Sequence, residues 1–189
     1  MRTEQDKIID AELAAKAAGG DQNAFVILYD KYAGAIFRHI IFRGGDKAVA
    51  EDIASQTFMR FWDWLRENKP VKSCKALLYR IAGNLFIDLT RTKEYKNLSL
   101  EDMSENKGAQ PAAKENIAID LEKKEEITAL KNALNKLPEL YKQILTMRYL
   151  DELSVAEIAK ATGKKSGAIY VSIYRGIKAL RQAMVEAKR

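Results

Sequence analysis

The chain lacks most of the side chains from which disulfide scaffolds, zinc sites and membrane spans are built. Its 189 residues include one cysteine, Cys74, and one histidine, His39. One cysteine cannot form an internal disulfide, and these two residues cannot supply a zinc site, so we expect no metal and no cofactor. No apolar run approaches the roughly 18 residues of a membrane-spanning helix. These absences favour a cytoplasmic protein in a reducing compartment, without direct insertion into a membrane.

Catalytic motifs are missing as well. Neither His39 nor Cys74 has an obvious catalytic partner nearby in the sequence, and no glycine-rich phosphate loop is present. We therefore expect a protein that is not an enzyme. The chain carries 32 Lys and Arg against 26 Asp and Glu, and this net charge of +6 favours polyanionic partners.

Proline is scarce, and the long stretches between the three prolines repeat apolar residues every three or four positions. This pattern predicts an all-α fold. A first helical stripe begins at Asp21 and ends at Arg43-Gly44-Gly45. A second helix opens at Asp46 and runs to about Leu65, and a third spans about 73–92. Three or four helices before residue 96 should form a first bundle.

A change in composition divides the chain. Residues 96–120 are polar, contain Gly108 and Pro111, and lack a sustained apolar stripe. Eight acidic side chains stand against four basic ones in 99–126, whereas 162–189 has seven basic residues and one acidic residue. We expect two small helical domains, residues 1–95 and 121–189, joined by a flexible acidic linker, residues 96–120.

The most specific local pattern lies between Leu153 and Arg181. Ser154 and Glu157 have the spacing of a capping box, and Gly163 suits a short turn before the next helix. That helix has apolar residues at spacings of four, four and three, which predicts a helix-turn-helix. Its outer face and entrance carry bases for phosphates and tyrosines for base edges or sugars: Lys164, Lys165, Tyr170, Tyr174, Lys178 and Arg181.

The second and third helices have unusual polar and aromatic patterns. Four large aromatics of the second helix cover more than one face, so some should be exposed and could receive a partner helix, although a wide core face explains them equally well. The third helix should present Tyr79, Arg80, Asn84, Asp88 and Arg91 on or near its polar face. The Asn84 amide could pair with an unstacked base, or this face could simply be solvated.

Taken in order, these elements resemble the extracytoplasmic-function sigma factors of bacteria. The matching motifs are D-I-x-x-Q-T-F in the second helix, L-Y-R-I-A-x-N-x-x-x-D in the third, and the terminal helix-turn-helix, over about Ala24 to Leu180. The resemblance implies a factor that binds RNA polymerase core and directs promoter-specific transcription initiation. In that family, region two binds the beta-prime clamp helices and melts the −10 element, while region four binds the beta flap and reads the −35 element.

The resemblance also implies site residues, carried over by position, and control by an anti-sigma factor. The polymerase set comprises Asp52, Gln56, Phe58, Arg60 and Trp62. The −10 set comprises Arg80, Asn84, Asp88 and Arg91. The −35 set comprises Lys164, Lys165, Ser166, Tyr170, Val171, Tyr174, Arg175 and Lys178.

Several positions depart from the family pattern. Ser55 stands where many members have Gln, and Gly83 lies inside a helix where Arg is frequent. Tyr170 and Ser172 occupy positions that are commonly basic, so the −35 bases that this chain prefers cannot be inferred from those of its relatives. The residues alone leave a second interpretation open, a stand-alone helix-turn-helix regulator. It would leave the aromatic helix and the Asn84 helix without a purpose.

Overall fold

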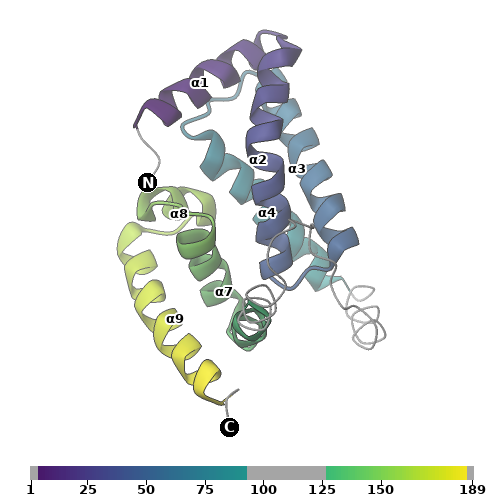
Figure 1. Ribbon diagram of the computed structural model, residues 1–189. Helices are drawn as coiled ribbons and strands as arrows, with labels where there is room; N and C mark the ends of the chain where they lie inside the picture. Colours follow the sequence, from purple (N-terminus) through teal and green to yellow (C-terminus); the bar gives the residue numbers. More distant parts are fainter. Residues whose placement is uncertain (1–3, 93–126, 187–189) are drawn as a thin grey trace, which may run out of the picture.

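The computed structural model describes residues 4–92 and 127–186, and every regular element in these ranges is a helix (Figure 1). This confirms the expected all-α fold. The predicted linker, residues 96–120, lies outside the described residues. Residues 127–135 are helical. The other helices are α1 (Glu4–Ala18), α2 (Gln22–Phe42), α3 (Lys47–Arg66), α4 (Cys74–Arg91), α7 (Glu139–Leu145), the π-helical turn η2 (Thr146–Leu150), α8 (Val155–Thr162) and α9 (Ser166–Glu186).

Short polar side chains start the helices of the first bundle. Asp21, Asp46 and Ser73 precede α2, α3 and α4, and each accepts a hydrogen bond from the backbone N–H three residues further on. Gly44 has φ of +102°, a conformation that favours glycine, and separates α2 from α3. Helix α3 ends at Arg66, before Pro70. The predicted starts and stops are therefore confirmed to within about one residue.

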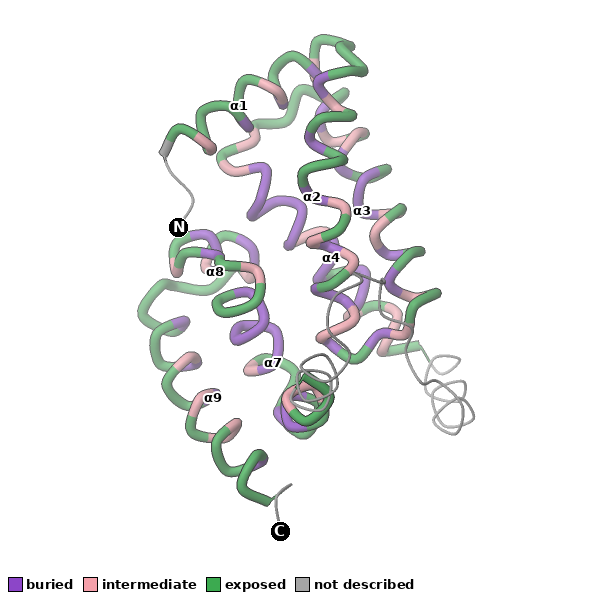
Figure 2. Tube along the Cα trace, in the orientation of Figure 1, coloured by how far each residue is buried: buried purple, intermediate pink, exposed green. Residues whose placement is uncertain are grey.

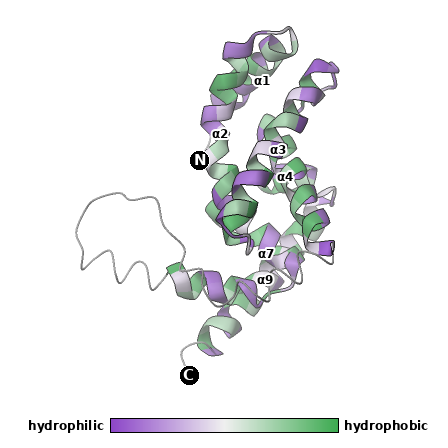
Figure 3. Ribbon diagram, turned by 90° about the vertical axis from the view of Figure 1, so that its right-hand side faces the viewer, coloured by the Kyte–Doolittle hydropathy of each residue, from purple (hydrophilic) through white to green (hydrophobic). Residues whose placement is uncertain are grey.

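The first four helices form a bundle in which α2 and α3 lie side by side, α1 crosses one end, and α4 closes the core (Figure 1). Their inward faces are buried (Figure 2). The C-terminal helices form a second group, with α9 packed against α7 and α8. In the view turned by 90°, this group lies below the bundle (Figure 3).

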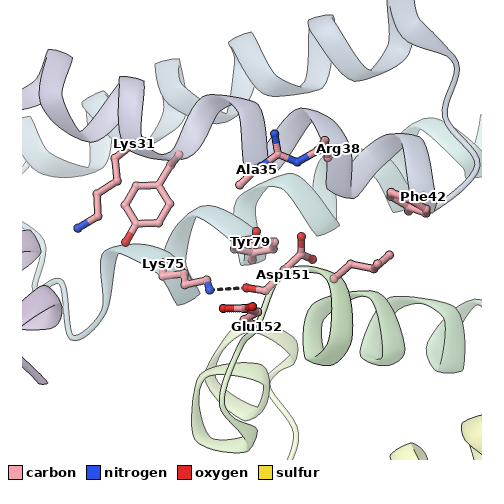
Figure 4. A pocket seen from close by; sticks show the side chains of 10 residues that line it. Lys31, Ala35, Arg38, Phe42, Lys75, Tyr79, Asp151 and Glu152 are labelled. Atoms are coloured by element: carbon pink, nitrogen blue, oxygen red, sulfur yellow. Dashed lines mark hydrogen bonds between the residues drawn. The ribbon is translucent and has the colours of Figure 1, made fainter. Parts of the chain in front are cut away.

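The two groups share a large apolar cluster, and the C-terminal group also has a smaller cluster of its own around Leu134 and Leu145. Met147, Leu153 and Ile158 from the C-terminal group belong to the same buried cluster as Ile40 and Leu78 from the first bundle. Helix α8 packs directly on α4. The first bundle and the C-terminal group therefore pack against each other in this conformation, and Asp151 contacts both α2 and α4 (Figure 4).

The capping box of α8 is present as predicted. The Ser154 hydroxyl accepts a hydrogen bond from the Glu157 backbone N–H at 3.2 Å, and the Glu157 carboxylate accepts one from the Ser154 backbone N–H at 2.9 Å. Burial alone would raise the pKa of Glu157, but the hydrogen bonds from Ser154 outweigh it and lower that pKa, with help from Lys75 and Lys7. The ionised form is therefore the one that the native state favours.

Ser154→Ala should lower the free energy of unfolding by about 1 kcal/mol at pH 7, the usual cost of losing a helix cap. A carboxylate whose pKa is lower in the native state stabilises the folded protein fully at pH values above its unfolded pKa of about 4.3. This contribution to the free energy of unfolding is lost as the pH falls through the lower native pKa. The cost of Ser154→Ala should therefore shrink at pH 3. Urea unfolding at both pH values measures it, with Ser55→Ala on the exposed part of α3 as the matched control. An equal loss at both pH values would contradict the ionic part of the argument.

Candidate nucleic-acid and partner interfaces

The polymerase set lies on α3, and most of it is accessible. Asp52 and Arg60 are exposed, and the Gln56 Nε2 donates a hydrogen bond to Asp52 Oδ2 at 2.9 Å. Trp62 is half-buried, with its ring edge-on to Phe25 at 4.7 Å between centroids. This set therefore presents an exposed carboxylate and guanidinium together with a half-buried amide and a half-buried indole.

Phe58 differs from the other members because it is buried, with only 3% of its surface exposed. Phe61 is buried as well, and the Phe25 ring of α2 lies 6.3 Å from each of these two rings, between centroids. Trp62 and Trp64 are half-buried, so some aromatics of this helix reach the surface, as expected. Phe58 instead supports Tyr29 at 4.7 Å between ring centroids.

Tyr29 and Met59 are large apolar side chains that are exposed here. The sequence pattern already groups Met59 with Asp52, Gln56 and Arg60 in a surface that could receive a partner helix, whereas sequence analysis missed Tyr29. Met59 is three residues from Gln56 and Trp62, a spacing that places it on their helix face.

The −10 set lies on α4. Asn84, Asp88 and Arg91 are exposed, and their spacings of four and three place them on one face of the helix. Arg80 is half-buried, with its guanidinium carbon 5.2 Å from the centroid of the Trp64 ring. The Lys69 ammonium lies 5.1 Å from the same ring. Trp64 thus connects the loop before α4 with the −10 set through two cation–π contacts.

Tyr79 was expected on or near the polar face of this helix, and the structure corrects that. Its side chain is fully buried, edge-on to the His39 ring at 5.0 Å. Burial and the neighbouring Asp151 carboxylate raise the pKa of Tyr79, so its hydroxyl stays protonated. Tyr79 is buried because the C-terminal group covers this side of α4, which the spacing of residues within α4 could not reveal.

The −35 set surrounds the outer face of α9. All eight of its members are exposed, and Tyr174 and Tyr170 are the most open, at 74% and 63%. Gly163, with φ of +69°, makes the turn that leads into this helix. The face presents hydroxyl-bearing rings flanked by Arg175 and Lys178, a combination suited to a phosphate-lined groove.

Ser172 does not share that face. Only 9% of its surface is exposed, and its hydroxyl donates a hydrogen bond to the backbone oxygen of Ala168 at 2.8 Å. The absence of a basic residue at position 172 therefore removes no side chain from the outer face of α9.

Within 4–92 and 127–186, no group of three or more His, Cys, Asp or Glu residues is arranged to hold a metal ion. None of the helices described there combines the length and apolar character needed to cross a membrane.

Comparison with known proteins decides the family. Residues 28–95 match the family Sigma-70 region 2, and residues 127–180 match Sigma-70, region 4. The chain is 30% identical over 173 residues to the ECF RNA polymerase sigma factor SigW of Bacillus subtilis, covering 87% of this chain and 91% of that protein. It belongs to the ECF RNA polymerase sigma factors. It is therefore a transcription initiation factor that binds RNA polymerase core and selects promoters.

Other relatives agree with this assignment. The ECF sigma factor BldN of Streptomyces coelicolor is 30% identical over 180 residues, which cover 94% of this chain and 67% of that protein. Among solved structures, CnrH in complex with the cytosolic domain of CnrY has the same fold, with a TM-score of 0.70 and 23% identity, covering 96% of this sigma factor and 99% of CnrH.

The burial of Ser172 leads to a test within the recognition helix. Ser172→Lys should destabilise this sigma factor by about 1–3 kcal/mol, because the side chain must carry a charge into a packed face. Tyr170→Lys, two residues away on the exposed face, should change stability by less than about 0.5 kcal/mol. Urea unfolding compares the two. Equal stability of both variants would place position 172 on the outer face.

Proposed function

We propose that this sigma factor binds the beta-prime clamp helices through the polymerase set, contacts the −10 strand through the −10 set, and reads the −35 duplex through the −35 set. Region four would also contact the beta flap. The working units are residues 1–95 and 121–189, joined by the linker 96–120. The observation that carries the proposal is the exposure of three separate chemical surfaces, on α3, α4 and α9, in a single chain.

The chemistry of each surface suits its assigned partner. On α4, an exposed amide stands between cations, as recognition of an unstacked base beside its phosphates requires. Helix α9 carries basic residues and tyrosines on its outer face, and it follows the capped helix α8 and a short turn. In a helix-turn-helix, the second helix of this arrangement lies in the major groove. Neither surface needs a reacting group, so the role we assign is binding and not catalysis.

We further propose that this sigma factor works in the cytoplasm, where core polymerase and promoter DNA are found, and that an anti-sigma factor controls it. The likeness to solved complexes supports this second point. One is CnrH with the cytosolic domain of CnrY. Another, with a TM-score of 0.64 and 21% identity, covering 89% of this chain and 99% of that one, is the sigma factor RpoE with the anti-sigma factor NepR from Bartonella quintana.

Purified protein mixed with bacterial core polymerase tests the assignment as a whole. Gel filtration should show a one-to-one complex, and run-off transcription from a promoter library should start at a defined −35 and −10 pair. A protein that fails to bind core but alone protects a symmetric DNA site would instead be a stand-alone regulator.

Asn84→Ala should reduce opening of the −10 element and leave the affinity for core polymerase unchanged, because it removes a base contact outside the polymerase set. Permanganate reactivity of unpaired thymines measures opening, and fluorescence anisotropy measures affinity. Asn23→Ala, an exposed amide on α2, is the matched control and should change neither. Asp52→Asn should do the opposite and lower polymerase affinity. Equal loss of opening and affinity in Asn84→Ala would refute its assigned role.

Lys178→Ala should weaken holoenzyme binding to all −35 sequences alike and reduce the slope of log affinity against log salt by about one, as the loss of one phosphate contact requires. Lys47→Ala, which removes an exposed charge from α3, should leave the slope unchanged. Binding titrations from low to moderate salt on several −35 variants provide both readouts. A change in sequence preference would make Lys178 a base reader.

A further inference from the structure

The first half of α9 lacks the side chains that most often read bases. Residues 166–174 contain no charged side chain and no amide. Arginine, lysine, asparagine, glutamine and the carboxylates identify a base pair by hydrogen bonds to its edge in the major groove. In a helix-turn-helix, the N-terminal residues of the second helix contact those edges. These residues of α9 therefore cannot form any of the usual hydrogen-bonded pairs with a base.

Cations flank this segment on both sides. Lys164 and Lys165 precede it, Arg175 follows it directly, and Lys178 lies one turn further on. All of these side chains are exposed. Such cations bind phosphates and thereby fix the position of a helix on the duplex, without identifying the sequence. The identification of bases is thus left to the segment between them.

The exposed face of this segment is apolar. Helix α9 lies at the outer edge of the C-terminal group (Figure 1). Val171 is 49% exposed, and its neighbours Tyr170 and Tyr174 are more open still. At about 100° per residue, Tyr174 lies between the other two around the helix axis, so the three side chains form one continuous apolar strip. Val171 offers only methyl groups to a partner, whereas each tyrosine adds a hydroxyl to an apolar ring.

The strip becomes narrower towards the start of the helix, where Gly167 and Ala168 are exposed. Among the described residues, nothing lies within 4 Å of a Cβ atom placed on Gly167, and its φ is outside the left-handed region. Neither crowding nor a turn therefore requires glycine here, although glycine is unfavourable in a helix. The absence of a side chain does allow the backbone to approach a bound molecule closely.

An apolar strip in the major groove can recognise one feature of the bases. Thymine presents a 5-methyl group there, whereas adenine, guanine and cytosine present hydrogen-bond donors and acceptors without such a methyl group. Alanine and other apolar side chains contact the thymine methyl group directly. A face with small residues at its tip and apolar residues behind them therefore matches thymine better than any other base.

We propose that this sigma factor identifies thymines in its −35 element by their 5-methyl groups, which pack against Ala168, Val171 and the ring of Tyr174. The flanking cations hold the phosphates. The inference rests on the proposed function, because it takes the −35 duplex as the partner of α9. It adds the chemical feature that α9 reads, and it requires a thymine, on either strand, at the position that faces Val171.

Deoxyuridine provides the test, because it differs from thymidine only in lacking the 5-methyl group. Run-off transcription with the holoenzyme first defines the −35 element, and each thymine on either strand is then replaced singly. Holoenzyme affinity should fall about fourfold at each contacted thymine, since burying one carbon contributes about 0.8 kcal/mol. Deoxyuridine placed between the −35 and −10 elements is the control and should leave the affinity unchanged.

Variants of α9 connect the methyl group to a residue. Val171→Ala removes the exposed methyl groups of the side chain, so the thymine that faces it should lose most of its preference over deoxyuridine. Val185→Ala, which truncates another exposed valine near the end of the same helix, is the matched control and should keep the fourfold effect. Circular dichroism shows that both variants are folded.

Two results would overturn the proposal. One is that deoxyuridine has no effect anywhere in the −35 element. The other is that every thymine shows the same effect in the unmodified protein and in Val171→Ala. A protein that binds no core polymerase would refute the proposed function instead, and its direct binding to duplexes with thymine or deoxyuridine would still decide whether α9 contacts methyl groups.

Discussion

Asp151 is the residue on which the arrangement of the first bundle and the C-terminal group most depends. Its carboxylate accepts the hydrogen bond of His39 from α2, and its backbone oxygen accepts that of Lys75 from α4. A buried carboxylate must be paired to remain charged, and a buried lysine must have an acceptor. The segment between η2 and α8 is therefore held against two helices at once, which positions the helix-turn-helix relative to the first bundle.

This constraint accounts for features that look unfavourable in isolation. Gly83 weakens α4 as a helix, and Arg43 is a fully buried cation at the end of α2. A Cβ atom at position 83 would stand 3.0 Å from Gln143 Nε2, so Gly83 leaves room for that side chain, while Glu139 and the face of the Phe86 ring, 4.6 Å away, compensate the Arg43 charge. Gly83 and Arg43 are therefore unfavourable within the first bundle alone, and their neighbours Gln143 and Glu139 belong to the C-terminal group.

Sequence reasoning succeeded where the signal is local. The caps at Asp21, Asp46 and Ser73, the Ser154 capping box and the Gly163 turn each depend on residues within one helical turn, so their spacing predicts them. It failed for Tyr79, whose burial depends on what covers α4, and it could not show that Phe58, carried over from the resemblance, is buried. The position of an aromatic residue within a helix does not indicate which other helices will pack against it.

The sequence by itself determined the all-α fold, the boundaries of α2, α3 and α4, the helix-turn-helix and the resemblance to sigma factors, because periodicity, capping and motif order are properties of neighbouring residues. It also identified His39 as a residue without a nearby carboxylate partner. Only the tertiary structure supplied that partner, Asp151, which is 112 positions further along the chain. Contacts of such separation depend on how whole helices pack, and no local pattern encodes which distant side chain will face a given residue.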